Sequence, residues 1–89
     1  MPMTILLAED EGAIAETVLY ALRAEGYAAE HVLLGGEVLP RLRRGGIDLV
    51  ILDVKMQGID GLDTLAQLRQ HDEGVRVVMI SGHATIATA

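Results

Sequence analysis

Two short apolar runs end directly in acidic residues, and this feature constrains the possible folds more than any other in the sequence. Residues 4–8 are TILLA and lead into Glu9, Asp10 and Glu11, while residues 49–53 are LVILD. An unbroken apolar run of this length is typical of a strand covered on both faces, as in a parallel sheet. The sequence therefore predicts a buried sheet with an acidic site where the strands end.

Helical patterns alternate with the apolar runs along the chain. The segments predicted as strands are residues 4–8, 28–33, 47–53 and 75–81, and those predicted as helices are residues 13–22, 35–44 and 62–70. The apolar stripes expected to face the core comprise Ile14, Val18, Ala21, Leu22 and Ala24 in the first helix and Leu62, Leu65, Ala66 and Leu68 in the third. Gly26 stands where the first helix would end, and Pro40 fits the second helix only within its first turn. A fourth helix is predicted to begin within residues 83–89.

Strands that alternate with helices predict βαβ crossovers, a parallel sheet and hence an α/β fold. In such sheets ligands bind beyond the carboxyl ends of the strands, where the strand order reverses. Glu9, Asp10 and Asp53 all lie at these ends, so we expect their side chains to converge. Gly61, beyond Asp53, is expected to form a turn that needs a positive φ.

Converging carboxylates repel one another, so the predicted cluster is costly unless a cation sits in it. Oxygen ligands suit Mg²⁺, which accepts a site of one or two carboxylates together with water. With such an ion bound, Asp53 would be a nucleophile toward a phosphoryl group, because the metal offsets the negative charge of both reactants.

Each of these residues also has a plainer structural interpretation. The acids at residues 9–11 could form a solvated loop, with Glu11 placed at the start of the following helix. Asp53 and Ser81 could each cap a loop or a helix. His31 is expected at the surface, with no metal-binding partner at a suitable spacing.

The composition of the chain limits which binding partners and which cellular location are expected for the protein. The chain has 89 residues, which suits one domain, and no cysteine, which excludes disulfides and thiolate metal sites. Its net charge of −6 disfavours nucleic acid, because phosphate backbones repel an acidic surface. No apolar run is long enough to span a membrane, and the N-terminus lacks the basic flank of a signal peptide. We therefore expect a cytoplasmic protein without direct nucleic-acid or membrane partners.

Three motifs together carry a resemblance to a known family. They are ILLAEDE at residues 5–11, DLVILDVKMQGIDG at residues 48–61 and VVMISGHA at residues 77–84. With these motifs in order along all 89 residues, the chain resembles a response-regulator receiver domain of bacterial two-component signalling. The resemblance implies a flavodoxin-like, doubly wound parallel sheet with the strand order 2-1-3-4-5.

The resemblance also implies a role for each site residue. A sensor histidine kinase would transfer a phosphoryl group to Asp53, with Mg²⁺ held by Asp10, Asp53 and the backbone carbonyl of Lys55. Glu9 would contact the metal through water, and Ser81 would be the switch hydroxyl that moves toward the phosphoryl oxygen. Any enzymatic activity would be limited to Mg²⁺-dependent self-phosphorylation and autodephosphorylation.

The chain departs from the family pattern in two places. Receiver domains carry a lysine at the end of a fifth strand, and this sequence stops at Ala89, before that lysine would be reached. We therefore expect residues 1–89 to form a C-terminally truncated receiver domain with strand order 2-1-3-4, without the fifth strand and helix, and with impaired phosphorylation. The second departure is Gln57, where the family usually has proline, and it would change the stiffness of the loop.

Without a fifth strand, residues 75–81 would form an exposed sheet edge, and Arg76 would be its only charged residue to oppose pairing with another chain. Unpaired apolar edges associate with other chains, so we expect a homodimer or higher assembly, edge-paired or domain-swapped, through this strand. The alternative function is that of a receiver-derived fragment, natural or engineered, whose main property is folding and self-association. A phosphohydrolase of the haloacid-dehalogenase type is disfavoured, because Lys55 stands where that family needs a second acid.

Overall fold

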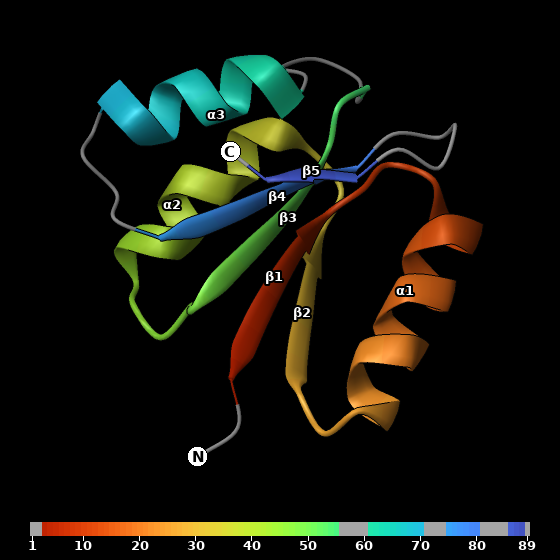
Figure 1. Cartoon of the computed structure of the whole chain (residues 1–89). Helices are drawn as coiled ribbons and strands as arrows, with labels where there is room; N and C mark the ends of the chain where they lie inside the picture. The colour runs from red at the N-terminus through yellow and green to blue at the C-terminus, as the bar shows by residue number, and fades with distance from the viewer. Residues whose placement is uncertain (1–2, 56–60, 71–74, 81–85, 89) are drawn as a thin grey trace.

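Strands from across the chain form one sheet in the computed structural model, whose described residues are 3–55, 61–70, 75–80 and 86–88 (Figure 1). The strands are β1 (Thr4–Ala8), β2 (Ala28–Val32), β3 (Leu49–Asp53), β4 (Arg76–Ile80) and β5 (Ile86–Thr88). The helices are α1 (Gly12–Ala24), α2 (Val38–Arg43), which follows the 3₁₀ turn η1 (Gly35–Glu37), and α3 (Gly61–Gln70). Within these residues the sheet order is β2-β1-β3-β4-β5.

The predicted α/β architecture and the parallel order 2-1-3-4 are confirmed. The pairs β1–β2, β1–β3 and β3–β4 are all parallel. Helix α1 lies on one face of the sheet and helices α2 and α3 lie on the other, as in a doubly wound fold (Figure 1). This order makes β1 and β3 direct neighbours, so the two strands that lead into acids lie side by side.

The register between β1 and β3 brings their acidic ends level. Ala8, the last residue of β1, pairs with Leu52 of β3. Glu9 therefore leaves β1 at the height of Asp53, the last residue of β3. Because the strands are parallel, both residues lie at the same edge of the sheet.

The main core lies between the sheet and helices α2 and α3. Successive side chains of a strand point to opposite faces, so alternate residues of β1, β3 and β4 face these helices. The buried members of this core are Leu6, Ala8, Val38, Leu42, Val50, Leu52, Leu68, Val77 and Met79. Their burial determines which face each strand turns inward, and with it the direction in which the strand-end residues point.

The opposite face of the sheet is covered less completely. Ile5 and Leu7 of β1 are buried there. The side chains of α1 at the predicted helical spacing are half-buried, and so are the alternate residues of β3 and β4 on this face. These residues are Ile14, Val18 and Leu22 from α1 and Leu49, Ile51, Val78 and Ile80 from the strands.

The helix predictions hold in outline and fail in detail. Pro40 lies in the first turn of α2, where its missing N–H is tolerated, and Gly26 follows α1 with a φ of 92°. In α3, Leu68 is buried as predicted, but Leu62 is 59% exposed, and the buried position on this helix that was not predicted is Thr64. The predicted stripes were also too wide, because Ala21, Ala24 and Ala66 are exposed. A helix that packs on a single sheet turns only a narrow stripe toward it.

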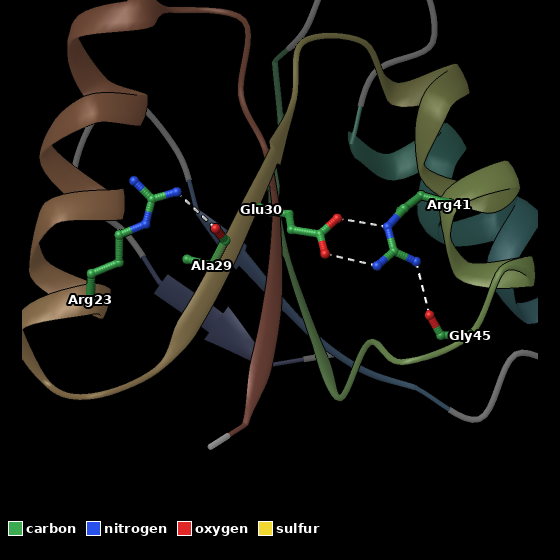
Figure 2. Close-up of polar contacts among 5 residues, drawn as sticks. All are labelled: Arg23, Ala29, Glu30, Arg41 and Gly45. Atoms are coloured by element: carbon green, nitrogen blue, oxygen red, sulfur yellow. Dashed lines mark hydrogen bonds and ion pairs between the residues drawn. The ribbon is translucent and has the colours of Figure 1, made fainter. Parts of the chain in front are cut away.

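Strand β2 is held by arginines from the helices on both sides of it (Figure 2). Arg23 of α1 donates from Nη2 to the Ala29 carbonyl oxygen at 2.9 Å. Arg41 of α2 donates to both carboxylate oxygens of Glu30, at 2.7 and 2.8 Å, and to the Gly45 carbonyl oxygen at 2.9 Å. These contacts tie a strand in which no residue is fully buried to both helical layers.

The C-terminal region differs from the prediction. The backbone of Ile86–Thr88 forms β5, which is antiparallel to β4 and pairs Ile80 with Ile86 and Val78 with Thr88. The fourth helix predicted within residues 83–89 is therefore wrong, and so is the open edge predicted for the fourth strand. The edge of β4 offers backbone groups that need partners, and the β-branched Ile86 and Thr88 favour a strand there. The sheet is accordingly not limited to four strands, although its additional strand is antiparallel.

Candidate functional site

Three carboxylates lie together at the carboxyl ends of β1 and β3. Glu9, Asp10 and Asp53 each offer one oxygen, and these oxygens all lie within 4.8 Å of one another. Glu9 is 1% exposed and Asp53 is 6% exposed, while Asp10 is half-buried. These are the three residues that the sequence predicts to converge at the strand ends. Their roles in metal binding and phosphorylation stay predictions.

The backbone of Glu9 is anchored to the end of β2. Its N–H donates to the Val32 carbonyl oxygen at 3.1 Å, and its own carbonyl oxygen lies 2.7 Å from Nε2 of His31. Its side chain accepts a hydrogen bond at Oε1 from the Glu11 N–H at 3.0 Å. The outer strand therefore holds in place the turn that carries the first two acids.

Asp53 is anchored to the chain that follows it and to β4. The Lys55 N–H donates to Asp53 Oδ1 at 3.1 Å, which orients the carboxylate. The Val54 N–H donates to the Ile80 carbonyl oxygen at 2.8 Å, and the Gly61 N–H donates to the Val54 carbonyl oxygen at 3.0 Å. The start of α3 is thereby bound to the strand end that presents Asp53.

Gly61 is required at this point for a reason other than the predicted one. The described glycines with positive φ are Gly26, Gly45 and Gly46, so the expectation of a positive φ at Gly61 is wrong. A Cβ at Gly61 would instead overlap with the Asp53 carbonyl oxygen and lie 2.8 Å from the Asp53 carbonyl carbon. The start of α3 approaches the backbone of β3 so closely that only glycine fits.

The electrostatics of the cluster favour a cation. The pKa of the Glu9 carboxyl is raised from 4.5 to about 7, chiefly because burial disfavours its charged form. The hydrogen bond from the Glu11 N–H lowers this pKa, whereas Asp53 and Asp10 raise it. A positive ion among these oxygens would offset both the burial and the repulsion. Three hard oxygen donors therefore fit Mg²⁺ as the expected ion.

Several predicted features lie outside the described residues. These are the switch hydroxyl of Ser81 and the departure at Gln57. Lys55 is described and its side chain is exposed, but the role predicted for its backbone carbonyl is not tested by these contacts.

His31 is the residue near the cluster that the sequence reasoning missed. The sequence predicted a surface position, whereas the side chain is half-buried and reaches the Glu9 carbonyl oxygen. The position of His31 in the sequence could have indicated this, because His31 lies near the carboxyl end of the strand that pairs with β1. A polar side chain there stands at the same edge as the acids.

The described helices include none that is both long enough and apolar enough to cross a membrane. The predicted cytoplasmic location is a separate matter and stays a prediction.

Comparisons with known proteins agree on the type of domain. A family model described as the response regulator receiver domain matches residues 5–89. The alginate biosynthesis transcriptional regulatory protein AlgB of Pseudomonas putida is 39% identical over 85 residues, which cover 96% of this chain and 19% of AlgB. The chain thus spans about a fifth of the length of this relative.

Solved structures show the same fold. The response regulator TrrA of Thermotoga maritima, in a complex with Mg²⁺ and BeF, matches with a TM-score of 0.84 and 32% identity. This match covers 91% of the present chain and 72% of TrrA. The complex of the histidine kinase ThkA with TrrA gives a TM-score of 0.84 and 31% identity, over 93% of this chain and 72% of the matched one.

Proposed function

This chain belongs to the response regulator receiver domain family, and we propose on that basis that Asp53 accepts a phosphoryl group from a sensor histidine kinase. The observation that carries the proposal is the cluster of Glu9, Asp10 and Asp53, whose oxygens lie within 4.8 Å of one another. The family explains why a chain would keep such a cluster at the ends of its central strands.

The residues of this chain suit Asp53 as the nucleophile. One Asp53 oxygen attacks the phosphorus of a phosphohistidine, the O–P bond forms as the N–P bond breaks, and the departing imidazole takes up a proton. Burial of Asp53 removes water that would compete for its carboxylate, and the Lys55 N–H holds Oδ1 in a fixed orientation. Bound Mg²⁺ would supply the positive charge that offsets the carboxylates and the phosphoryl oxygens.

The metal would be held by Asp10, Asp53 and the backbone carbonyl of Lys55, with Glu9 acting through water. The proximity of the three carboxylates and the raised pKa of Glu9 support this assignment. Ser81, which follows β4, would be the switch hydroxyl. The match to TrrA in its complex with Mg²⁺ and BeF supports the metal, and the ThkA–TrrA complex supports a kinase as the partner.

Phosphoryl transfer to the intact chain tests the proposal. The protein is incubated with Mg²⁺ and acetyl phosphate, and the modified residue is located by mass spectrometry. We expect one phosphoryl group on Asp53, none in Asp53→Asn, and normal incorporation in Asp48→Asn. Asp48 is a matched control, because it is an exposed acid just before the opposite end of β3. Wild-type protein that stays unmodified, or Asp53→Asn that is modified equally, would overturn the proposal.

The second candidate function is self-association of a receiver-derived fragment. Pairing with β5 removes the open β4 edge on which this prediction rested. A different observation favours it, because four apolar residues of β3 and β4 on the α1 face are only half-buried: Leu49, Ile51, Val78 and Ile80. Light scattering over a range of protein concentrations tests it, with dimers or larger assemblies expected. A monomer at every concentration would exclude this candidate.

A further inference from the structure

We infer that His31 is a positioning residue for the acidic cluster. Its ring N–H holds the peptide that joins Glu9 to Asp10, and thereby sets the direction of the Asp10 carboxylate. The inference rests on the proposed metal site and adds to it a residue of β2, a strand that supplies no member of the cluster.

The contact between His31 and Glu9 is short and has a defined direction. Nε2 of His31 lies 2.7 Å from the Glu9 carbonyl oxygen. A carbonyl oxygen can only accept, so Nε2 carries the hydrogen and donates. The side chain is half-buried, which shields the bond from competing water.

This bond replaces a missing rung of the β1–β2 ladder. The Ala28 N–H donates to the Met3 carbonyl oxygen, and parallel pairing advances by two residues on each strand. Continued in this way, the ladder would offer the Leu34 N–H to the carbonyl oxygen of Glu9. The Leu34 N–H instead donates to Oε1 of Glu37 at 3.1 Å, beyond the end of β2. The His31 ring therefore supplies the donor that the diverging backbone no longer provides.

Both polar backbone groups of Glu9 are consequently held by β2. Its N–H donates to the Val32 carbonyl oxygen at 3.1 Å, and its carbonyl oxygen accepts from His31. The Glu9 carbonyl and the Asp10 nitrogen belong to one planar peptide unit, so fixing the carbonyl also fixes the bond that leads to Asp10. Asp10 is the most exposed member of the cluster.

Two substitutions test the N–H donor of His31 and its aromatic ring independently. His31→Phe keeps an aromatic ring but has no N–H, whereas His31→Gln loses the ring but keeps an amide donor at a similar reach. Arg41→Met is the matched control, because it removes a different polar tie to β2, on Glu30, without touching Glu9 (Figure 2). Mg²⁺ affinity is measured by isothermal titration calorimetry on the whole chain, and urea unfolding shows the folded fraction of each variant.

We expect His31→Phe to weaken Mg²⁺ binding about tenfold, as is typical when a group that orients metal ligands is lost. His31→Gln should recover most of the affinity, and Arg41→Met should bind Mg²⁺ as the wild type does. A merely structural role would lower unfolding stability in all three variants without this order of affinities. Equal affinity in His31→Phe and wild type, or weaker binding in His31→Gln than in His31→Phe, would overturn the inference alone. Failure of the wild type to bind Mg²⁺ would overturn the proposed metal site, and this inference with it.

Discussion

Strands β3 and β2 serve the same site but are held in place by different forces. In β3, Val50 and Leu52 are fully buried, and the strand ends in the buried Asp53. In β2, no residue is fully buried, and the strand is tied by hydrogen bonds from Arg23 and Arg41. Apolar burial thus positions the proposed phosphoacceptor, while polar contacts hold β2 against the helices.

The difference shows how a small domain can build a site between a central strand and an outer one. Burying apolar side chains stabilises the fold strongly, so β3 is hard to displace. Exposed ion pairs contribute little, so β2 is the softer support. Substitutions in the two strands should therefore differ in size and in what they disturb.

The largest effect is expected for Leu52→Ala in β3. Leu52 is fully buried in the main core, so the change should lower the free energy of unfolding by about 4 kcal/mol. Val32→Ala in β2 is the comparison, because Val32 packs half-buried against the same core and should lose only about 1 kcal/mol. Urea unfolding followed by circular dichroism measures both. Equal losses would show that β2 is held by burial in the same way as β3.

The next largest effect is expected for Gly61→Ala, which should lower the free energy of unfolding by about 3 kcal/mol because the added methyl group overpacks the site. The added Cβ would overlap with the Asp53 carbonyl oxygen and lie 2.9 Å from the Val54 Cα, so β3 and α3 would have to move apart. Gly12→Ala is the matched control, because a Cβ placed there meets no atom within 4 Å apart from its chain neighbours and the backbone of its own helix. Thermal unfolding of the two variants should differ clearly. A Gly61→Ala protein as stable as Gly12→Ala would contradict the close approach.

The acidic cluster should make metal-free protein less stable as pH rises. The pKa of Glu9 is about 7 in the folded chain, above the ordinary value of 4.5, so the folded state binds this proton more tightly than the unfolded state. The stabilising contribution of Glu9 is full below about pH 4.5 and is lost as pH rises through about 7.

Glu9→Gln isolates this effect, because glutamine has a similar shape and no charge. The free energy of unfolding is measured in the presence of a chelator from about pH 5 to about pH 8. Its decrease over this range should be larger in wild type than in Glu9→Gln. Saturating Mg²⁺ should reduce the wild-type loss. Parallel pH profiles for the two proteins would show that Glu9 does not carry a raised pKa.

The smallest effect is expected for Arg41→Met. The Arg41–Glu30 pair lies at the surface, with side chains 14% and 47% exposed, so its loss should lower the free energy of unfolding only slightly. Hydrogen exchange should show faster exchange in β2 than in wild type and little change in β3. A decrease in the free energy of unfolding as large as that of Leu52→Ala would mean that the Arg41–Glu30 contact stabilises the fold as much as core burial does.

The sequence was most informative where apolar burial decides the structure. The runs that form β1, β3 and β4 were recognised, and their strand ends led directly to Glu9, Asp10 and Asp53. The register that makes Glu9 level with Asp53 follows from parallel pairing, so the convergence of these acids needed no side-chain detail.

The sequence was least informative where local patterns allow two structures or where distant groups meet. Ile86 and Thr88 suit a strand as well as the predicted helix, and only the available edge of β4 decides between them. The need for glycine at position 61 depends on how closely α3 approaches Asp53. The contact of His31 depends on where β2 diverges from β1, and no local pattern records that point.

The central claim is that Glu9, Asp10 and Asp53 form one divalent-cation site. Anomalous diffraction from crystals soaked in Mn²⁺, which prefers the same oxygen ligands as Mg²⁺, tests it most directly. We expect one strong peak between the carboxylates of Asp10 and Asp53, absent from crystals of Asp10→Asn soaked in the same way. A Mn²⁺ peak elsewhere on the molecule, with none at this cluster, would contradict it.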